Sequence, residues 1–354
     1  MKRITLNLFF CCLTMGAFAQ QPLGGFLYGT EAEPKGTEWE APEKLSLNKE
    51  QPRAYFFSFA DVESARRVQP EASSYWQSLN GTWKFHWAPN PDERPKAFYE
   101  TQFDVAAWDD ITVPSCWNVV GIQKDGSLKY GVPIYCNQPV IFKHTKVVGD
   151  WKGGVMREPN KDWTTYKYRN EVGSYRRTFR IPEDWREREV YINFDGVNSF
   201  FYLWINGKYV GFSKNSRNTA SFNISDYLVK GENMVAVEVY RNSDGSFLEA
   251  QDMYRLPGIF RDTYLTSTSK VELRDMKINT DLTAGGASVE VNAMLRNLGA
   301  KAVKGYSLTY SVYQNKLYSD EIVGQVGKPV VSETFVLDKD GSRNVSTRFE
   351  IAGA

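Results

Sequence analysis

The segment from Ser199 to Phe212, "SFFYLWINGKYVGF", decides the fold class because it has the pattern of a complete β-hairpin. Phe200, Tyr202 and Trp204 alternate with other residues, which places all three on one face of a strand. The Asn-Gly pair at 206–207 then offers the two positive-φ positions of a tight two-residue turn. The segment therefore predicts two antiparallel strands joined at that turn.

Similar alternation occurs on both sides of this hairpin, whereas helix signals are few. The segments "EVYINFDGV" and "NMVAVEVYRN" each place three apolar side chains on one face, which are Val190, Ile192 and Phe194, and Val235, Val237 and Val239. One short helical turn is predicted for "DVESARRV" near Asp61. Short strands separated by turn signals predict an all-β chain built from sandwiches.

The chain divides into four regions by pattern. Residues 1–19 are expected to be a signal peptide, and residues 20–50 an extended leader lying on the fold. Residues 51–267 are expected to form a jelly-roll sandwich. From Val271 onward, strand patterns recur about every ten to twelve residues, as in an immunoglobulin-like sandwich. Residues 268–354 are therefore assigned to such a domain, expected to be incomplete because the strand pattern stops at the final "EIAGA".

The N-terminus has the three parts of a secretory signal. Lys2 and Arg3 precede an apolar run, and the small residues of Ala17-Phe18-Ala19 follow it. We expect cleavage after Ala19 and a secreted or periplasmic protein. No second hydrophobic segment reaches membrane length, so no membrane span is expected.

Composition narrows the function classes. The 354 residues carry a formal net charge of +1 without a basic block, which argues against a nucleic-acid partner. The 10 Trp, 20 Tyr and 21 Phe pack cores, but aromatic faces also stack on sugars, which favours a carbohydrate ligand. With only two histidines, a zinc site or a histidine-based triad is hard to build. Cys116 and Cys136 would remain after cleavage, and the sequence leaves open whether they pair.

Two polar clusters fall at strand ends, where the loops of a β-scaffold carry function. One is "VPIYCNQP" with Asn137, and the other is "EAQDMYRLPGIFRD", residues 249–262. Taken locally, Glu249 and Asp252 could be an acid and base pair for glycoside hydrolysis, which needs two carboxylates about 5–10 Å apart. The alternative is that Asp252 and Asp262 simply pair with Arg255 and Arg261, and that Asn137 alone is a turn residue.

Seven ordered motifs, from about residue 51 to 265, resemble the N-terminal part of glycoside hydrolase family 2 β-galactosidases. They are "PRAYFFSF", "LNGTWKFHW", "VPSCWN", "PIYCNQP", "VGSYRRTF", "DGVNSFFYLWINGKYVGFS" and "GENMVAVEVYRNSDGSFLEAQDMYRLPGIFRD". The resemblance implies a sugar-binding jelly roll, an immunoglobulin-like domain and a TIM barrel that carries the catalytic pair. The loop at residues 249–262 of this chain resembles that of β-galactosidases more than those of β-glucuronidases and β-mannosidases.

The same resemblance assigns roles to five residues. Asn137 would reach the galactose site, and Asp252 would bind sugar hydroxyls together with a sodium-like monovalent cation. A carboxylate suits both roles, since it accepts hydrogen bonds and is a hard oxygen ligand. A brace that holds the loop is expected from Arg255, Arg261 and Asp262.

The barrel of the family is missing from this sequence, and with it both catalytic glutamates and the magnesium ligands. We therefore expect part of a retaining β-galactosidase, acting on a β-galactoside glycan and homo-oligomeric in its parent form. The isolated chain is expected to contain no catalytic residue and to be inactive. The alternative is a stand-alone carbohydrate-binding module.

Overall fold

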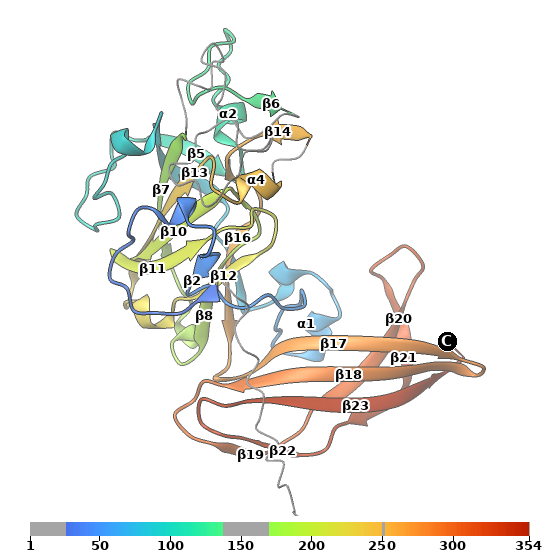
Figure 1. The fold of residues 1–354 in the computed structure, drawn as a ribbon. Coiled ribbons are helices and arrows are strands. Elements are labelled where there is room, and N and C mark those ends of the chain that lie inside the picture. Colours follow the sequence, from blue (N-terminus) through green and yellow to red (C-terminus); the bar gives the residue numbers. More distant parts are fainter. Residues whose placement is uncertain (1–25, 137–169, 250–251, 354) are drawn as a thin grey trace, which may run out of the picture.

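The computed structural model describes residues 26–136, 170–249 and 252–353 (Figure 1). Strands dominate these residues, and the α-helices are single turns of four residues, so the all-β prediction is confirmed. The helix expected near Asp61 is present as α1. The α-helices are α1 (Val62–Ala65), α2 (Trp117–Val120) and α4 (Ser246–Glu249). The 3-10 helices are η1 (Glu38–Glu40), η2 (Pro70–Ala72), η3 (Pro91–Glu93), η5 (Glu183–Trp185) and η6 (Ser225–Tyr227).

Two facing sheets form the first sandwich. The larger sheet has eight strands. Their order is β1 (Phe26–Leu27), β2 (Ser46–Leu47), β11 (Lys208–Ser213), β10 (Phe200–Ile205), β13 (Glu232–Tyr240), β7 (Val172–Arg180), β4 (Gly81–Ala88) and β5 (Asp109–Val113). The smaller sheet has the order β12 (Ala220–Asn223), β8 (Glu189–Phe194), β16 (Thr263–Thr268) and β3 (Trp76–Ser78). The segment expected as a leader thus adds two short strands to the edge of the larger sheet.

The hairpin of β10 and β11 forms as the alternation predicted. Asn206 and Gly207 have φ values of 52° and 79°, and Ile205 pairs with Lys208 across the turn. The side chain of Asn206 also accepts a hydrogen bond from Met234 N at 2.8 Å, which ties the turn to β13.

Both faces of β10 are buried, which the alternation did not predict. Phe201, Leu203 and Ile205 enter the core between the two sheets, together with the apolar faces predicted for β8 and β13. Phe200, Tyr202 and Trp204 share the opposite face as predicted, but they enter a second aromatic core. This second core is closed from outside by Phe98 and by the partly buried Trp39, Tyr99, Phe103 and Trp108. The eight-stranded sheet is therefore an inner layer, and its strand ends are left to carry a site.

A second set of antiparallel strands follows the sandwich. Three long strands are paired in the order β17 (Val271–Thr283), β18 (Gly286–Asn297) and β23 (Ser342–Ala352). Two further pairs are β19 (Val303–Tyr306) with β22 (Phe335–Leu337), and β20 (Thr309–Asn315) with β21 (Ile322–Val331). The strand patterns expected after Val271 are found. β21 was not among the predicted strands, because its glycines and proline are typical of a loop.

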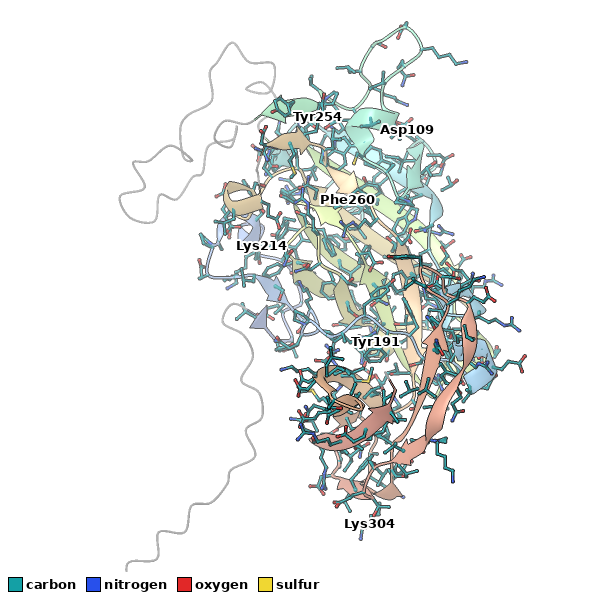
Figure 2. All side chains as sticks on the ribbon, turned by 90° about the vertical axis from the view of Figure 1, so that its right-hand side faces the viewer. Asp109, Tyr191, Lys214, Tyr254, Phe260 and Lys304 are labelled. Carbon is teal, nitrogen blue, oxygen red and sulfur yellow. The ribbon has the colours of Figure 1, made fainter. Side chains whose placement is uncertain are left out.

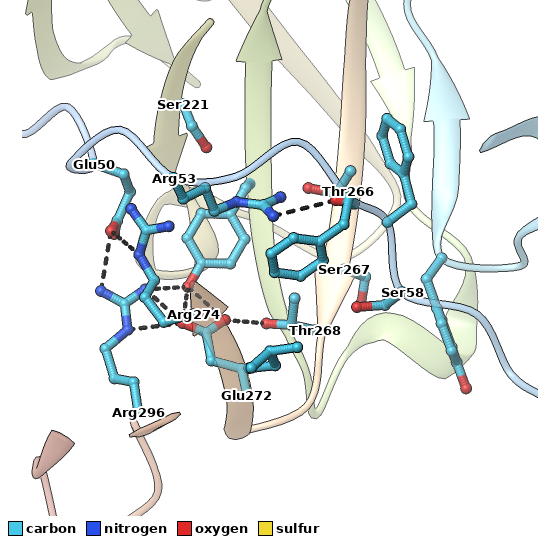
Figure 3. Close-up of a pocket in the computed structure, with 15 residues that line it drawn as sticks. Glu50, Arg53, Ser58, Ser221, Thr266, Ser267, Thr268, Glu272, Arg274 and Arg296 are labelled. Atoms are coloured by element: carbon cyan, nitrogen blue, oxygen red, sulfur yellow. Dashed lines mark hydrogen bonds and ion pairs between the residues drawn. The ribbon is translucent and has the colours of Figure 1, made fainter. Parts of the chain in front are cut away.

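An ionic network joins this second set to the sandwich (Figure 3). The Arg296 guanidinium donates to Glu272 at 2.7 Å, to Glu50 at 3.0 Å and to the Tyr191 hydroxyl at 2.9 Å. The Arg274 guanidinium lies 3.3 Å from Glu50. Burial alone would lower the pKa of Arg296, but the two carboxylates raise it well above its ordinary value. Charges from the leader and the second set thus neutralise one another at the junction, and the sandwich adds the Tyr191 hydroxyl.

Candidate sugar-binding site

Two segments that are far apart in the sequence meet at one end of the sandwich, in the upper part of Figure 1. β6 (Ile134–Cys136) pairs antiparallel with β14 (Met253–Arg255). In this register Tyr254 lies opposite Tyr135. The structure therefore brings together "IYC" of the first polar cluster and "MYR" of the second. Asn137 follows Cys136 in the sequence and lies outside the described residues.

Asp252 stands exposed just before β14 and has a defined partner. The Tyr135 hydroxyl donates a hydrogen bond to its Oδ1 atom. The rings of Tyr135 and Tyr254 lie 5.6 Å apart at 63°, in an edge-to-face contact. Their exposed fractions are 53% and 61%. An oriented carboxylate and two half-exposed rings therefore share this end of the molecule, where Figure 2 labels Tyr254.

A buried ion pair supports the β6–β14 pair from below. Arg241 Nη1 lies 2.6 Å from Glu171 Oε1, and both side chains are 1% exposed. Arg241 Nη2 donates to the carbonyl oxygens of Val132 and Arg255, at 3.0 Å and 3.2 Å. Val132 lies two residues before β6, and Arg255 is the last residue of β14. One guanidinium thus holds both strands at once.

Glu171 is itself fully engaged. Its Oε2 atom accepts from Trp117 Nε1 at 3.0 Å and from Asn118 Nδ2 at 3.2 Å. Burial of a charged pair is tolerated when such hydrogen bonds complete its coordination. Glu171 and Arg241 were not predicted as site residues. Each is a charged residue directly next to an apolar strand, but this position indicates an ion pair only once β7 and β13 are known to be neighbours.

Glu249 is bound to a different part of the fold. Its carboxylate accepts from Ser216 N at 2.8 Å and also from the Ser216 hydroxyl. Lys49, which is 3% exposed, lies near enough to feel its charge. Burial lowers the pKa of Lys49 to about 8, and the attraction of Glu249 opposes this shift. These contacts anchor the Glu249 side chain to the segment around Ser216, which indicates a structural role.

The three residues expected as a brace lie at two different places. Arg255 is buried in β14, and its carbonyl is bound by Arg241. Arg261 Nη1 donates to the Arg217 carbonyl at 2.9 Å, and Asp262 Oδ1 accepts from Asn80 Nδ2 at 2.9 Å. The hydrogen bonds of Arg261 and Asp262 thus attach the far end of the 252–262 segment to neighbouring loops.

The turn at Pro257-Gly258 is hydrogen-bonded to the segment that leads into α2. Trp117 N donates to the Pro257 carbonyl at 3.1 Å, and Ser115 N to the Ile259 carbonyl at 2.7 Å. Gly258 between them has a φ of 133°, and a Cβ there would lie 2.6 Å from the Ser115 carbonyl oxygen. Only glycine allows this approach. The turn therefore fixes the start of α2 beneath β14.

Cys116 lies at the same contact and is a free thiol. Burial raises the pKa of its thiol. Within the described part of the chain, no group of three or more His, Cys, Asp or Glu could hold a metal ion. Among the same residues, no helix is long and apolar enough to cross a membrane.

Comparison with known proteins places this geometry in a family. Residues 76–269 match the family model described as "Glycosyl hydrolases family 2, sugar binding domain". The chain belongs to glycosyl hydrolase family 2. The matched range contains Asp252, Tyr254 and the Glu171–Arg241 pair, so the β6–β14 end lies within the family's sugar-binding domain.

Named relatives agree on an enzyme class. A β-galactosidase of Priestia megaterium is 42% identical over 246 residues, covering 69% of this chain and 22% of that protein. A β-galactosidase of Psychromonas ingrahamii is 37% identical over 252 residues, covering 71% and 22%. This family 2 chain thus spans about a fifth of the length of the curated relatives it matches.

Solved structures of family 2 proteins share the fold. A Bacteroides uniformis β-glucuronidase aligns with a TM-score of 0.57 and 19% identity, over 78% of this chain and 28% of that one. A family 2 member from Bacteroides cellulosilyticus DSM 14838 aligns with a TM-score of 0.55 and 20% identity, over 79% and 32%. At these identities the likeness describes the fold alone.

Proposed function

We propose that this chain is the sugar-binding portion of a secreted or periplasmic β-galactosidase that cleaves terminal β-D-galactosides with retention. The observation that supports this most is the β6–β14 pair, which presents the oriented carboxylate of Asp252 at one end of a family 2 sugar-binding domain. The β-galactosidase relatives, at 42% and 37% identity, support the galactoside as substrate. The proposed division of the mature chain remains 51–267 and 268–354, and the parent is proposed to be a homo-oligomer.

In this proposal Asp252 binds substrate hydroxyls, and Asn137 contributes an amide to the same pocket. Because the Tyr135 hydroxyl occupies Oδ1, the Oδ2 atom of Asp252 is the one that would receive a sugar hydroxyl or a sodium ion. Asp252 fits as one hard oxygen ligand of such a cation. The remaining ligands, and the magnesium site that the family implies, would have to come from outside the described residues.

The chemistry of retention needs a nucleophilic carboxylate and a second carboxyl group that acts first as acid and then as base. We propose that both come from outside this chain. Of the three acids in the 249–262 segment, Glu249 binds Ser216, Asp262 binds Asn80, and Asp252, which accepts from Tyr135, is assigned here to the substrate hydroxyls. The 354-residue chain should therefore release no p-nitrophenol from p-nitrophenyl β-D-galactoside. A robust rate that persists in Glu249→Ala and Asp252→Ala would contradict this division of labour.

Binding tests the sugar site itself. Methyl β-D-galactopyranoside should bind the chain with millimolar affinity in ligand-observed NMR, because half a pocket offers few contacts. Asp252→Asn should abolish the signal, whereas Asp226→Asn, an exposed aspartate in η6, should leave it unchanged. Equal binding of the two variants would refute the role of Asp252. Micromolar affinity would favour a stand-alone binding module instead, and preference for a methyl β-D-glucuronide would favour a glucuronidase parent.

A further inference from the structure

Tyr135 and Tyr254 are exposed, in contrast to the aromatic side chains that fill the two cores of the sandwich. Tyr175, Tyr202 and Tyr240 are each at most 1% exposed, whereas the two tyrosines of the β6–β14 pair are 53% and 61% exposed. A cross-strand aromatic pair would gain more by facing a core. Two neighbouring half-exposed rings beside a carboxylate are instead a pattern suited to binding.

The pair is also held in position before any ligand arrives. The Tyr135 ring is fixed at its far end by the hydrogen bond to Asp252, and at its side by the edge-to-face contact with Tyr254. Arg241 holds the backbone on both sides, through the carbonyls of Val132 and Arg255. Groups that are already ordered lose little conformational entropy on binding. The rings therefore form a rigid surface.

We propose that the Tyr135–Tyr254 pair is a stacking platform for the apolar face of a β-galactopyranoside whose hydroxyls bind Asp252. This rests on the proposed function and adds a second contact type to the same site. The axial 4-hydroxyl of galactose leaves the C–H groups at positions 3, 4 and 5 together on one side of the ring. That side matches the exposed face of an aromatic ring, while the opposite side presents its hydroxyls. Tyr254, the more exposed of the two, supplies the main face, and Tyr135 orients both Tyr254 and the carboxylate.

Saturation-transfer NMR of the full 354-residue chain with methyl β-D-galactopyranoside tests the platform. Saturation should be strongest at H3, H4 and H5. Tyr254→Ala should weaken binding about fivefold and erase that pattern, because a ring contact is lost. Tyr254→Trp should keep both, which shows that a ring is needed and not a tyrosine. Tyr318→Ala, which removes a 99% exposed tyrosine from the β20–β21 turn, should change neither.

The outcomes separate this inference from the proposed function. Binding that disappears in Asp252→Asn but survives Tyr254→Ala with an unchanged pattern would overturn the platform and leave the proposed sugar site standing. No saturation of the galactoside by the wild-type chain would overturn both. Tyr135→Phe keeps the ring and removes the hydroxyl, so the H3–H5 pattern should persist with weaker binding. Loss of the pattern in that variant would contradict the main role given to Tyr254.

Discussion

Arg241 and Glu171 form a buried ion pair because Arg241 directly follows β13, Glu171 directly precedes β7, and the two strands are neighbours. Tyr240 pairs with Val172 where β13 and β7 meet, so the two charged side chains come side by side one step further. Their contact distance is 2.6 Å, and each side chain is 1% exposed. The pair contacts the carbonyls of Val132 and Arg255, and so links the stability of the sheet to the geometry of β6 and β14.

Removal of either charge from this pair should be costly. Arg241→Met leaves the Glu171 carboxylate buried without its cation, and the Val132 and Arg255 carbonyls lose their donor. We expect a loss of about 3–5 kcal/mol in the free energy of unfolding. Urea titration followed by tryptophan fluorescence measures it. The double variant Glu171→Met/Arg241→Met should recover part of the loss, and a single-variant loss below about 1 kcal/mol would contradict the buried pairing.

Truncation of a buried leucine should lower the free energy of unfolding far more than truncation of an exposed one. Leu203 in β10 is fully buried between the sheets, whereas Leu282 in β17 is 85% exposed. Leu203→Ala should lower the free energy of unfolding by about 2–5 kcal/mol, because it leaves a cavity in a packed core. Leu282→Ala should change it by no more than about 0.5 kcal/mol. Similar losses from the two variants, measured by urea titration, would mean that β10 is not an inner strand.

The junction should loosen when Glu272 is neutralised. Glu272→Gln removes the charge that Arg296 binds at 2.7 Å and weakens the bond from the Thr268 hydroxyl, also 2.7 Å. Loss of a charge-assisted hydrogen bond of about 1.5–3 kcal/mol should speed amide exchange about ten- to hundredfold in residues 268–274. Glu321→Gln breaks the exposed pair with Lys316 and serves as the control. Unchanged exchange at 268–274 would show that the network does not hold the junction.

Lys49 should make stability depend on pH in the alkaline range. Burial lowers its pKa in the folded chain to about 8, from an ordinary value of 10.5. Below pH 8 both states hold the proton, and the folded chain carries a buried charge whose cost the attraction of Glu249 offsets only in part. Between the two values the unfolded chain still holds the proton that the folded chain has released, so stability rises with pH there.

The comparison with Lys49→Met isolates this effect. Relative to the variant, the wild type should gain about 3 kcal/mol of stability as pH rises from 8 to 10.5. Thermal melts at half-unit pH intervals measure it. Lys208→Met, which removes an exposed lysine at the start of β11, should run parallel to the wild type. A constant difference between Lys49→Met and the wild type across this range would refute the assignment.

The fold was predictable where the information is local. Alternating apolar residues in β8, β10 and β13, and the Asn-Gly turn at 206–207, each depend only on neighbours in sequence. The burial of the second face of β10 was not predictable in this way. It depends on Phe98 and Trp108, which are more than ninety residues away and form no regular pattern with it.

The candidate site was likewise predictable only in part. Asp252 was identified through resemblance, and the structure places it beside Tyr135, from the other polar cluster. Nothing local in either cluster shows that the two segments pair. The support from Glu171 and Arg241 was missed for that reason, since a charge next to a strand is usually solvated. The roles given to Asn137, Asp252, Arg255, Arg261 and Asp262 remain predictions.

The two-sided burial of β10 changes what can keep that strand in place. In a sheet with one wet face, sliding a strand by one residue would expose its apolar side chains, and that penalty sets the alignment. A slip of β10 would exchange one set of apolar side chains for another, Phe201 and Leu203 for Phe200 and Tyr202, and no polar face would resist it. The alignment instead comes from the Asn206-Gly207 turn with its bond to Met234, and from the buried hydrogen bond that the Tyr202 hydroxyl donates to Glu38. A half-buried turn residue, Asn206, thereby helps to decide which aromatic ring belongs to which core.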